Sequence, residues 1–394
     1  MATRIATTIP PPLQSRLRMP IDTVLFATTL ALIAFGFWMV FGTSFFQSMD
    51  SAKMGNDPLY FVKLQAKGVI VGAVALWFTM RTGYWKWKQY AIPLMLATLI
   101  ILCAVWPFHL PGLAIRENGA WRWFGHGALR FQPSELAKVT LVIYLAAMYA
   151  RPGLRVRVFE TGFLPPLIPA FLYFLLIERE PDLGTAMVLF LSAGTILIVA
   201  GARKRHIALF FGIGVLAVLL FGFGFGHRGG RMSTFVNPCI NRDYGGDQVC
   251  NSLYAVGSGG LLGEGMGQGK QKYLLTQANC DFIFATIAEE LGFFRSSLVI
   301  GCLLLIGWRG FRIALYTKDR FGSLLAAGIA AVISWQALIN IAVATGSIPA
   351  TGVPLPFISF GSSSMLFLMA GIGILLNIAQ HPEGEPPQLQ RRRV

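Results

Sequence analysis

Long apolar runs recur along the chain and are separated by shorter polar segments. A helix needs about 20 mainly apolar residues to cross the hydrocarbon core of a bilayer. The runs approach or exceed that length, so the pattern predicts an all-α polytopic membrane protein with about ten transmembrane helices. The predicted spans are residues 22–43, 61–80, 89–107, 133–150, 162–177, 183–201, 206–226, 281–308, 322–345 and 363–379.

Lysine and arginine collect in alternate loops and in both terminal segments, in groups of three or four with little acid nearby. Membrane proteins keep such basic loops on the cytoplasmic side. We therefore expect both termini in the cytoplasm and an even number of spans. The basic groups are Arg4, Arg16, Arg18; Arg81, Lys86, Lys88; Arg151, Arg155, Arg157; Arg203, Lys204, Arg205; Arg309, Arg312, Lys318, Arg320; and Arg391, Arg392, Arg393.

This pattern divides the chain into a cytoplasmic N-terminal tail (1–21), a ten-helix membrane domain (22–379) and a basic cytoplasmic C-terminal tail (380–394). Residues 1–19 are polar and basic and lack the apolar stretch of a cleavable signal peptide. The first apolar run is therefore expected to remain as an anchor. The Pro-rich tail from His381 is expected to be disordered.

The longest polar interruption, residues 227–280, separates the seventh and eighth predicted helices. It has no sustained apolar run, which predicts a large outer loop with short amphipathic or re-entrant pieces. Cys239 and Cys250 flank a polar part of this loop, and the oxidising side of the membrane would allow a disulfide between them. Their spacing alone leaves the bonded and free states open.

The composition agrees with a membrane protein, with 55% hydrophobic residues, 13% charged residues and a mean hydropathy of +0.60. A soluble protein of this length carries roughly twice that charged fraction. The net charge of +15 would suggest nucleic acid in a soluble protein. Here the basic loops account for it, so we expect no nucleic-acid partner and regard anionic membrane lipid as the further target.

Two ionisable residues near the start of the fourth predicted helix, Glu135 and Lys138, follow the sequence Phe-Gln-Pro-Ser at 131–134. They are three positions apart and so share a helix face. Ionisable groups inside a span are costly and usually have a function. The alternative is a structural ion pair near the interface, with Lys138 extending toward water.

The sixth predicted helix begins from the outer side with an acidic segment, residues 178–185. Asp182 is interpreted as an N-cap or first-turn acid. Glu180 is either an outward-facing acid or a metal ligand.

Glycine is dense between Tyr254 and Lys272. Glycine permits positive φ and a close approach of the backbone to a ligand. Exposed N–H groups, with Lys270 and Lys272, would cradle an anion such as pyrophosphate. The alternative is a flexible linker. The segment is no P-loop, because Gln271 follows its Gly-Lys where Ser or Thr is needed.

Asp281 opens the eighth predicted helix. It is either an N-cap or a carboxylate at the rim of a lipid-facing groove, where partial removal from water would raise its pKa and make it a general base. Glu289 is expected about two turns further along the helix. Glu290 points to the other side and needs a partner within the bundle.

The segment 351–364 is an uncharged outer loop with two prolines, Pro354 and Pro356, which resist regular helix. It is interpreted as the wall of a groove for lipid tails or as a re-entrant turn. A helix-breaking connector is the alternative.

Taken in order, these segments resemble the motifs of the SEDS family (shape, elongation, division and sporulation proteins), and the similarity runs from the first predicted helix to the last. The Glu-Pro-Asp at 180–182, the Gly-Gln-Gly-Lys-Gln-Lys at 267–272 and the Leu-Leu-Asn at 375–377 resemble the division branch. The elongation branch is the near alternative.

The resemblance implies a peptidoglycan glycosyltransferase that polymerises lipid II, an undecaprenyl-pyrophosphate-linked disaccharide pentapeptide, at the outer face of the bacterial cytoplasmic (inner) membrane. The family's proposed catalytic aspartate maps onto Asp281, which would act as base in an inverting displacement. Candidate substrate-binding residues are Arg122, Glu135, Lys138, Arg231, Gly259, Gly260, Lys270 and Ser359.

The cofactor and partner expectations also follow from this resemblance. No cofactor is expected beyond a divalent cation, Mg or Mn, that would help the cationic side chains to stabilise the departing pyrophosphate. The expected partners are a class B penicillin-binding protein with transpeptidase activity and, for the division branch, other division proteins.

The chain departs from the family pattern at several positions. Gln277 stands where a glutamate is usual, Phe294 and Arg295 replace a glycine, and Ser362 stands where a second glycine is common. Gln277 removes an acid near the proposed base, which bears on metal binding and activity. Two other functions therefore stay open: a lipid II flippase or transporter that uses the same charges along a path, and a catalytically weakened scaffold for a transpeptidase.

Overall fold

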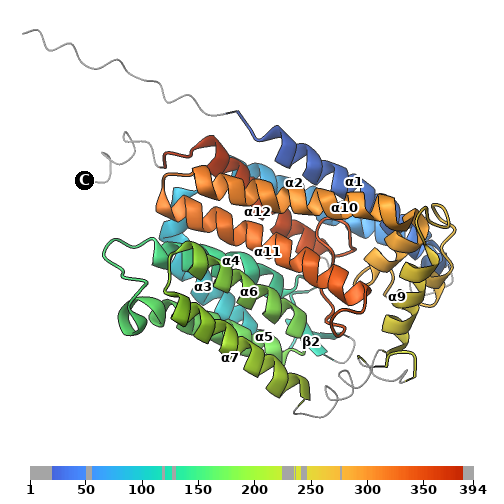
Figure 1. The fold of residues 1–394 in the computed structure, drawn as a ribbon, viewed down its shortest axis with the longest axis horizontal. Helices are drawn as coiled ribbons and strands as arrows, with labels where there is room; N and C mark the ends of the chain where they lie inside the picture. The colour runs from blue at the N-terminus through green and yellow to red at the C-terminus, as the bar shows by residue number, and fades with distance from the viewer. Residues whose placement is uncertain are drawn as a thin grey trace, which may run out of the picture.

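The computed structural model describes residues 20–49, 56–117, 120–126, 130–223, 235, 237–240, 246–275 and 277–384. Within this part of the chain, each of the ten predicted apolar runs coincides with a helix, and the all-α fold is confirmed (Figure 1). The helices are α1 (Thr23–Met49), α2 (Tyr60–Arg81), α3 (Trp85–Val105), α4 (Pro133–Tyr149), α5 (Ile168–Arg179), α6 (Leu183–Val199), α7 (Lys204–Phe223), α10 (Ile283–Tyr316), α11 (Arg320–Ala344) and α12 (Ser362–Gln380).

Seven segments of the described chain are long and apolar enough to cross a membrane by length and composition, and the protein is therefore a multi-pass membrane protein. Six of them belong to α1, α2, α3, α10, α11 and α12, and the seventh, Phe159–Arg179, contains α5. Helix α6 is apolar but shorter.

Helix α4 lies at the centre of the bundle, with fifteen of its seventeen residues buried. It packs against α3, α6 and α11. This position follows from its sequence, because a helix that carries Glu135 and Lys138 must turn them away from lipid and toward partners in the protein.

Small residues set how closely neighbouring helices approach. Helices α2 and α12 run side by side, and a Cβ built on Gly373 would lie 2.4 Å from the backbone oxygen of Leu76 in α2. A Cβ on Gly68 would lie 2.8 Å from the Cα of Ser362. Glycine at these positions lets the two backbones meet, as is common between membrane helices.

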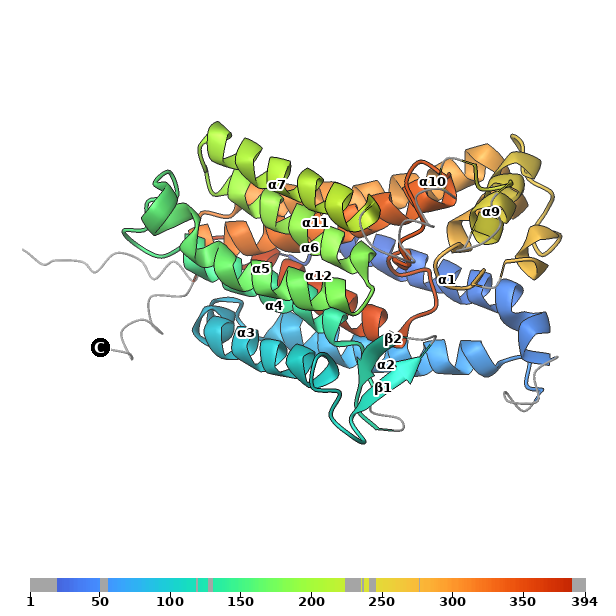
Figure 2. The same cartoon turned by 90° about the horizontal axis from the view of Figure 1, so that it is seen from below.

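A short amphipathic helix, α9 (Gly246–Ser258), lies at one end of the bundle and confirms the prediction of such a piece within 227–280 (Figures 1 and 2). Cys250 of α9 forms a disulfide with Cys239, with a Cα–Cα distance of 5.1 Å. The buried Ser252 donates a 2.7 Å hydrogen bond to the carbonyl oxygen of Ala344 at the end of α11. The segment that carries α9 is therefore attached to the bundle at α11.

Two elements differ from the sequence expectation. Strands β1 (Ala114–Glu117) and β2 (Ala120–Phe124) form an antiparallel hairpin between α3 and α4 that hydropathy does not predict. Residues 381–384 are held against the bundle, because Lys318 donates a 2.9 Å backbone hydrogen bond to the carbonyl oxygen of Pro382. The expectation of disorder from His381 onward is wrong for these four residues, and residues 385–394 lie outside the described part.

Candidate active site at the starts of α4, α6 and α10

Asp281 occupies a turn that is held from two sides just before α10. Its carbonyl oxygen accepts a 2.9 Å hydrogen bond from the side-chain amide of Asn340 in α11. The carbonyl oxygens of Asn279 and Cys280, its neighbours, accept hydrogen bonds from the Phe360 amide and the Ser359 hydroxyl at 2.9 and 2.6 Å. Asp281 is partly exposed as a whole residue, and these hydrogen bonds fix its backbone.

The Pro-rich loop approaches the Asp281 carboxylate directly. Gly352 has φ of +76°, and a Cβ built on it would lie 3.5 Å from Oδ2 of Asp281. The same loop contacts α6, because a Cβ on Gly184 would lie 2.8 Å from the carbonyl oxygen of Thr351. The predicted wall at 351–364 therefore lies between the starts of α6 and α10.

Asp182 caps α6, as the sequence predicted. Its Oδ1 accepts a 3.1 Å hydrogen bond from the backbone amide of Thr185. Its Oδ2 accepts hydrogen bonds from the Gln132 amide at 3.1 Å and the Ser134 hydroxyl at 3.4 Å. The cap thus joins the start of α6 to the start of α4, and brings two of the sequence motifs together.

Arg122 extends from β2 to the segment between α5 and α6. Its Nε donates a 2.8 Å hydrogen bond to the carbonyl oxygen of Glu180, and its terminal nitrogen bonds the carbonyl oxygen of Pro181. Glu180 itself is fully buried, and neither of its carboxyl oxygens has a hydrogen-bond partner among the described residues. We call Arg122, Glu180, Asp182 and Asp281 the carboxylate cluster.

The charges of this cluster act on one another. Burial and the negative charge of Asp182 raise the pKa of Asp281 from 3.8 to about 6, against the opposing effect of the Arg122 guanidinium. Burial and Asp182 also raise the pKa of Glu180 to about 9, against the opposing effect of Arg122. Asp281 is thus mostly ionised at neutral pH and Glu180 is protonated, so one carboxyl can accept a proton and the other can donate one.

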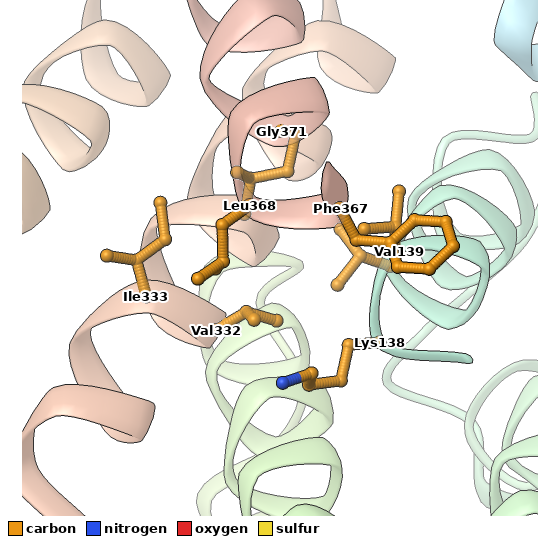
Figure 3. A pocket seen from close by; sticks show the side chains of 9 residues that line it. Lys138, Val139, Val332, Ile333, Phe367, Leu368 and Gly371 are labelled. Atoms are coloured by element: carbon orange, nitrogen blue, oxygen red, sulfur yellow. The ribbon is translucent and has the colours of Figure 1, made fainter. Parts of the chain in front are cut away.

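Glu135 and Lys138 form a buried ion pair one layer further into the bundle. The Lys138 Nζ lies 2.8 Å from the Glu135 carboxylate and donates a 2.6 Å hydrogen bond to Oε1 of Gln336. Gln336 in turn donates to the carbonyl oxygen of Pro354 at 3.0 Å. Lys138 also borders a narrow pocket between α4, α11 and α12 that is otherwise apolar (Figure 3).

Helix α11 connects this ion pair to Asp281. Gln336 contacts Lys138, and Asn340, one helical turn further on, contacts the carbonyl oxygens of Asp281 and Val353. The sequence analysis did not identify these two residues. Two amide side chains four positions apart in an apolar helix were the available signal.

The glycine-rich segment has a different role from the predicted anion cradle. Gly292 adopts φ of 73° and ψ of −177°, which breaks α10. The carbonyl oxygens of Glu289 and Glu290 just before this break accept hydrogen bonds from the backbone amides of Glu264 and Gly265 at 3.0 and 3.1 Å. The loop therefore satisfies carbonyls that the broken helix leaves open.

The side chains of Glu289 and Glu290 hold the same loop. Oε1 of Glu289 accepts from the backbone amides of Lys270 and Gln271 at 2.7 and 3.0 Å. Glu290 pairs with the buried Lys272 at 2.9 Å and accepts from the Gly267 amide. We call Lys272, Glu289 and Glu290 the glutamate clamp. The expected bundle partner of Glu290 is thus a loop lysine, and these amides are not free to cradle an anion.

The remaining predicted site residues occupy varied positions. Gly259 lies against α10, because a Cβ on it would lie 2.1 Å from the Ala288 carbonyl oxygen. Gly260 has open space around it, and Lys270 is exposed. Ser359 uses its hydroxyl to connect Leu355 and Cys280. Arg231 lies outside the described residues.

No three His, Cys, Asp or Glu side chains converge closely enough to hold a metal ion in the part of the chain that the structure describes.

A family model described as "Cell cycle protein", which covers FtsW, RodA and SpoVE, matches residues 22–384. The chain belongs to this family. The resemblance inferred from the motifs is thereby confirmed.

Relatives and solved structures agree with this assignment. The Stage V sporulation protein E of Bacillus subtilis (strain 168) is 36% identical over 361 residues, which cover 91% of this chain and 97% of that protein. The "Probable peptidoglycan glycosyltransferase FtsW" of Geobacter sulfurreducens (strain DL-1 / KN400) is 36% identical over 367 residues, with 93% and 96% covered.

Among solved structures, a chain from a peptidoglycan synthase complex that coordinates polymerization and crosslinking has a TM-score of 0.74 at 25% identity, covering 93% of this chain and 100% of that chain. The Thermus thermophilus rod shape determining protein RodA has a TM-score of 0.68 at 25% identity, covering 93% and 99%. The similarity thus extends over almost the whole fold.

Proposed function

We propose that this protein is a peptidoglycan glycosyltransferase that polymerises lipid II at the outer face of the bacterial inner membrane, in cell division. Membership of the family and the similarity to proteins named FtsW support the reaction. One structural observation carries the proposal. Asp281 is a partly exposed acidic residue on a backbone turn fixed by α11 and the Pro-rich loop, and Gly352 of that loop lies next to its carboxylate.

The proposed reaction is a single inverting displacement. Asp281 takes the proton of the acceptor sugar hydroxyl, and that oxygen forms a bond to the anomeric carbon of the donor. The bond from the anomeric carbon to the pyrophosphate oxygen breaks, and undecaprenyl pyrophosphate leaves with the electron pair. A pKa of about 6 suits this role, because the carboxylate is ionised at neutral pH and still basic enough to take a proton.

Positive charge is needed where the pyrophosphate leaves. Arg122 is the first candidate for stabilising the pyrophosphate, because its positive charge lowers the pKa of Asp281 and so acts at that carboxylate. The exposed Lys270 is the second candidate. Lys138 is buried and already pairs with Glu135 and Gln336, which supports a role in positioning the floor of the site. A Mg or Mn ion bound between the pyrophosphate and protein oxygens would supply further positive charge.

The proposed partner is a class B penicillin-binding protein that crosslinks the new strand, together with other division proteins. The similarity to a chain of a complex that joins polymerization to crosslinking supports this pairing. Polymerisation should therefore be measured with and without a class B penicillin-binding protein from the same organism.

The test uses purified full-length protein and lipid II, with glycan strands resolved by gel electrophoresis. We expect polymer from the wild type and none from Asp281→Asn. The matched control is Asp57→Asn, which removes an outer carboxylate that pairs with the exposed Lys63 and should leave polymerisation unchanged. Equal polymer from the wild type and the Asp281 variant would remove Asp281 from the chemistry. Transport of lipid II without polymer would favour the transporter alternative.

A further inference from the structure

Two loops at the basic end of the bundle form one continuous surface. The first follows α4 and includes a π-helical turn, η3 (Phe159–Phe163), and the second leads into α7. The ring of His206 in α7 lies against Phe159 and Phe163, with centroid distances of 5.4 and 5.1 Å. The Tyr149 hydroxyl donates a 3.0 Å hydrogen bond to the carbonyl oxygen of Phe163. Figures 1 and 2 show this region projecting at the end opposite α9.

Glycine fixes the shape of the first loop. A Cβ on Gly162 would lie 1.9 Å from the carbonyl oxygen of Arg155, so the chain folds back tightly on itself there. The Val158 amide donates a 2.8 Å hydrogen bond to the same carbonyl oxygen. The arginines of this loop are therefore carried on a compact turn.

This surface carries six exposed cations, which we call the basic interfacial patch: Arg151, Arg155, Arg157, Arg203, Lys204 and Arg205. Glu160 is the one acid within residues 150–165 and 200–206. Among the described residues, none of the six takes part in an ion pair or a cation–π contact. Two other cations at this end do have such partners: Arg309 pairs with Asp22 and Lys318 with Glu383.

Exposed apolar side chains belong to the same segment of the chain as Arg155 and Arg157, and Val158 directly follows Arg157. Val158, Leu164 and Ile168 are 39%, 43% and 54% exposed, and the apolar segment Phe159–Arg179 starts within the same loop. Cations without ion-pair partners can bind the phosphate groups of lipids. The exposed apolar side chains of the same surface can contact the acyl chains. A soluble anion has no apolar group that could contact Val158, Leu164 and Ile168.

We infer that the basic interfacial patch is a binding site for anionic phospholipid, whose phosphodiester group the arginines engage while Val158, Leu164 and Ile168 contact its acyl chains. The positive charge of these side chains suits the negatively charged phosphodiester group of this ligand. Clusters of four to eight basic residues next to a span are typical of anionic-lipid recognition. The site is separate from the carboxylate cluster and does not depend on the proposed glycosyltransferase activity.

The experiment is a titration of the purified full-length protein in neutral detergent with phosphatidylglycerol, with bound lipids counted by native mass spectrometry. Each cation near an anionic lipid is worth about fivefold in binding. We expect the variant R155Q/R157Q/R203Q/R205Q to bind phosphatidylglycerol about tenfold more weakly, or worse, than the wild type. Phosphatidylcholine of the same chain length should bind weakly to both.

Two matched variants make the result decisive. R81Q/K86Q/K88Q/R312Q removes the same charge from other exposed positions at this end and should change binding by less than about threefold. R155K/R157K/R203K/R205K keeps the charge and should retain binding within about threefold, which separates charge loss from misfolding. Equal weakening by the two glutamine variants would overturn the inference, and so would loss of binding in the lysine variant.

Inorganic phosphate distinguishes a lipid site from a soluble-anion site. At matched ionic strength, phosphate should displace phosphatidylglycerol no better than chloride does. Specific displacement by phosphate would overturn the assignment to lipid. Polymerisation of lipid II by the glutamine patch variant, measured in parallel, would show that loss of lipid binding and loss of the proposed activity are independent.

Discussion

The carboxylate cluster and the glutamate clamp both contain carboxyl groups removed from water, but these groups differ in their hydrogen-bond and ion-pair partners. In the clamp, Glu290 pairs with Lys272, and the Glu289 carboxylate accepts two backbone amides. In the cluster, Glu180 is fully buried with no hydrogen-bond partner for either carboxyl oxygen among the described residues, and Asp281 has a raised pKa. Buried carboxyl groups are therefore poor markers of function by themselves. We expect the proposed catalytic group, Asp281, to differ from the structural carboxyls in its raised pKa and its place next to the Pro-rich loop.

The largest expected effect on stability comes from breaking the clamp. Glu290→Gln leaves the Lys272 ammonium buried without its counter-charge, with a side chain only 3% exposed. Removing one partner of a buried ion pair destabilises a protein by about 3–5 kcal/mol. We expect a lower denaturation midpoint in detergent and normal polymerisation per folded molecule.

The control for this change is Glu264→Gln in the same loop, whose side chain is exposed. It should alter stability by less than about 0.5 kcal/mol. A stable Glu290 variant that has lost polymerisation would mean that the clamp belongs to the reaction, and the comparison between the two regions would fail.

A second change tests how the loop closes on α10. Gly263 has φ of +84°, and an added Cβ would lie 2.3 Å from the Glu290 carbonyl oxygen. Gly260 has φ of +51° with nothing within 4 Å of such a Cβ. Gly260→Ala should destabilise by about 1 kcal/mol through strain alone, and Gly263→Ala by about 2–3 kcal/mol because overpacking is added. Equal midpoints for the two variants would contradict the close approach.

The third prediction concerns pH and the cluster. A base acts only when ionised, so activity that depends on Asp281 should fall as the pH drops through about 6. The ionised fraction changes about tenfold between pH 7 and pH 5, and initial rates should follow it. An aspartate with its ordinary pKa of 3.8 would give a flat profile over this range.

Arg122 offers the control for the pH profile. Its positive charge lowers the pKa of Asp281, so Arg122→Gln should move the acidic limb of the profile to higher pH. An unmoved limb in this variant would assign the titration to another group.

The smallest expected effect is that of Glu180→Gln. With a pKa of about 9, the Glu180 carboxyl is neutral at pH 7, and glutamine replaces it with a neutral group of the same shape. Polymerisation at pH 7 should stay within about threefold of the wild type. A loss of a hundredfold or more would mean that the proton on Glu180 is transferred during the reaction.

The sequence was sufficient for much of the fold because apolar length is a strong signal in membrane proteins. Each predicted span coincides with a helix, and α9 appears where an amphipathic piece was expected. The N-cap role of Asp182 was also predictable, since capping depends on neighbours along the chain. The motif at 131–138, Asp182 and the loop at 351–364 do meet near Asp281.

The contacts between residues far apart in the chain could not be predicted from the sequence. Dense glycine indicates that a backbone comes close to something, and sequence alone does not tell whether that is a ligand or α10. The amides of Lys270 and Gln271 turned out to bond Glu289, whose position depends on the break at Gly292. Gln336 and Asn340 were missed for a related reason, because an isolated amide in an apolar helix has no partner that the sequence can name.

The break in α10 has a mechanical consequence. Because the amides of Glu264 and Gly265 replace the turn that Gly292 interrupts, the outer end of α10 and the glycine-rich loop form a single stiff piece. A pull on that loop from outside the membrane would be transmitted along α10 to the turn that carries Asp281. A protein that binds this loop would therefore be able to shift the position of Asp281 without contacting it.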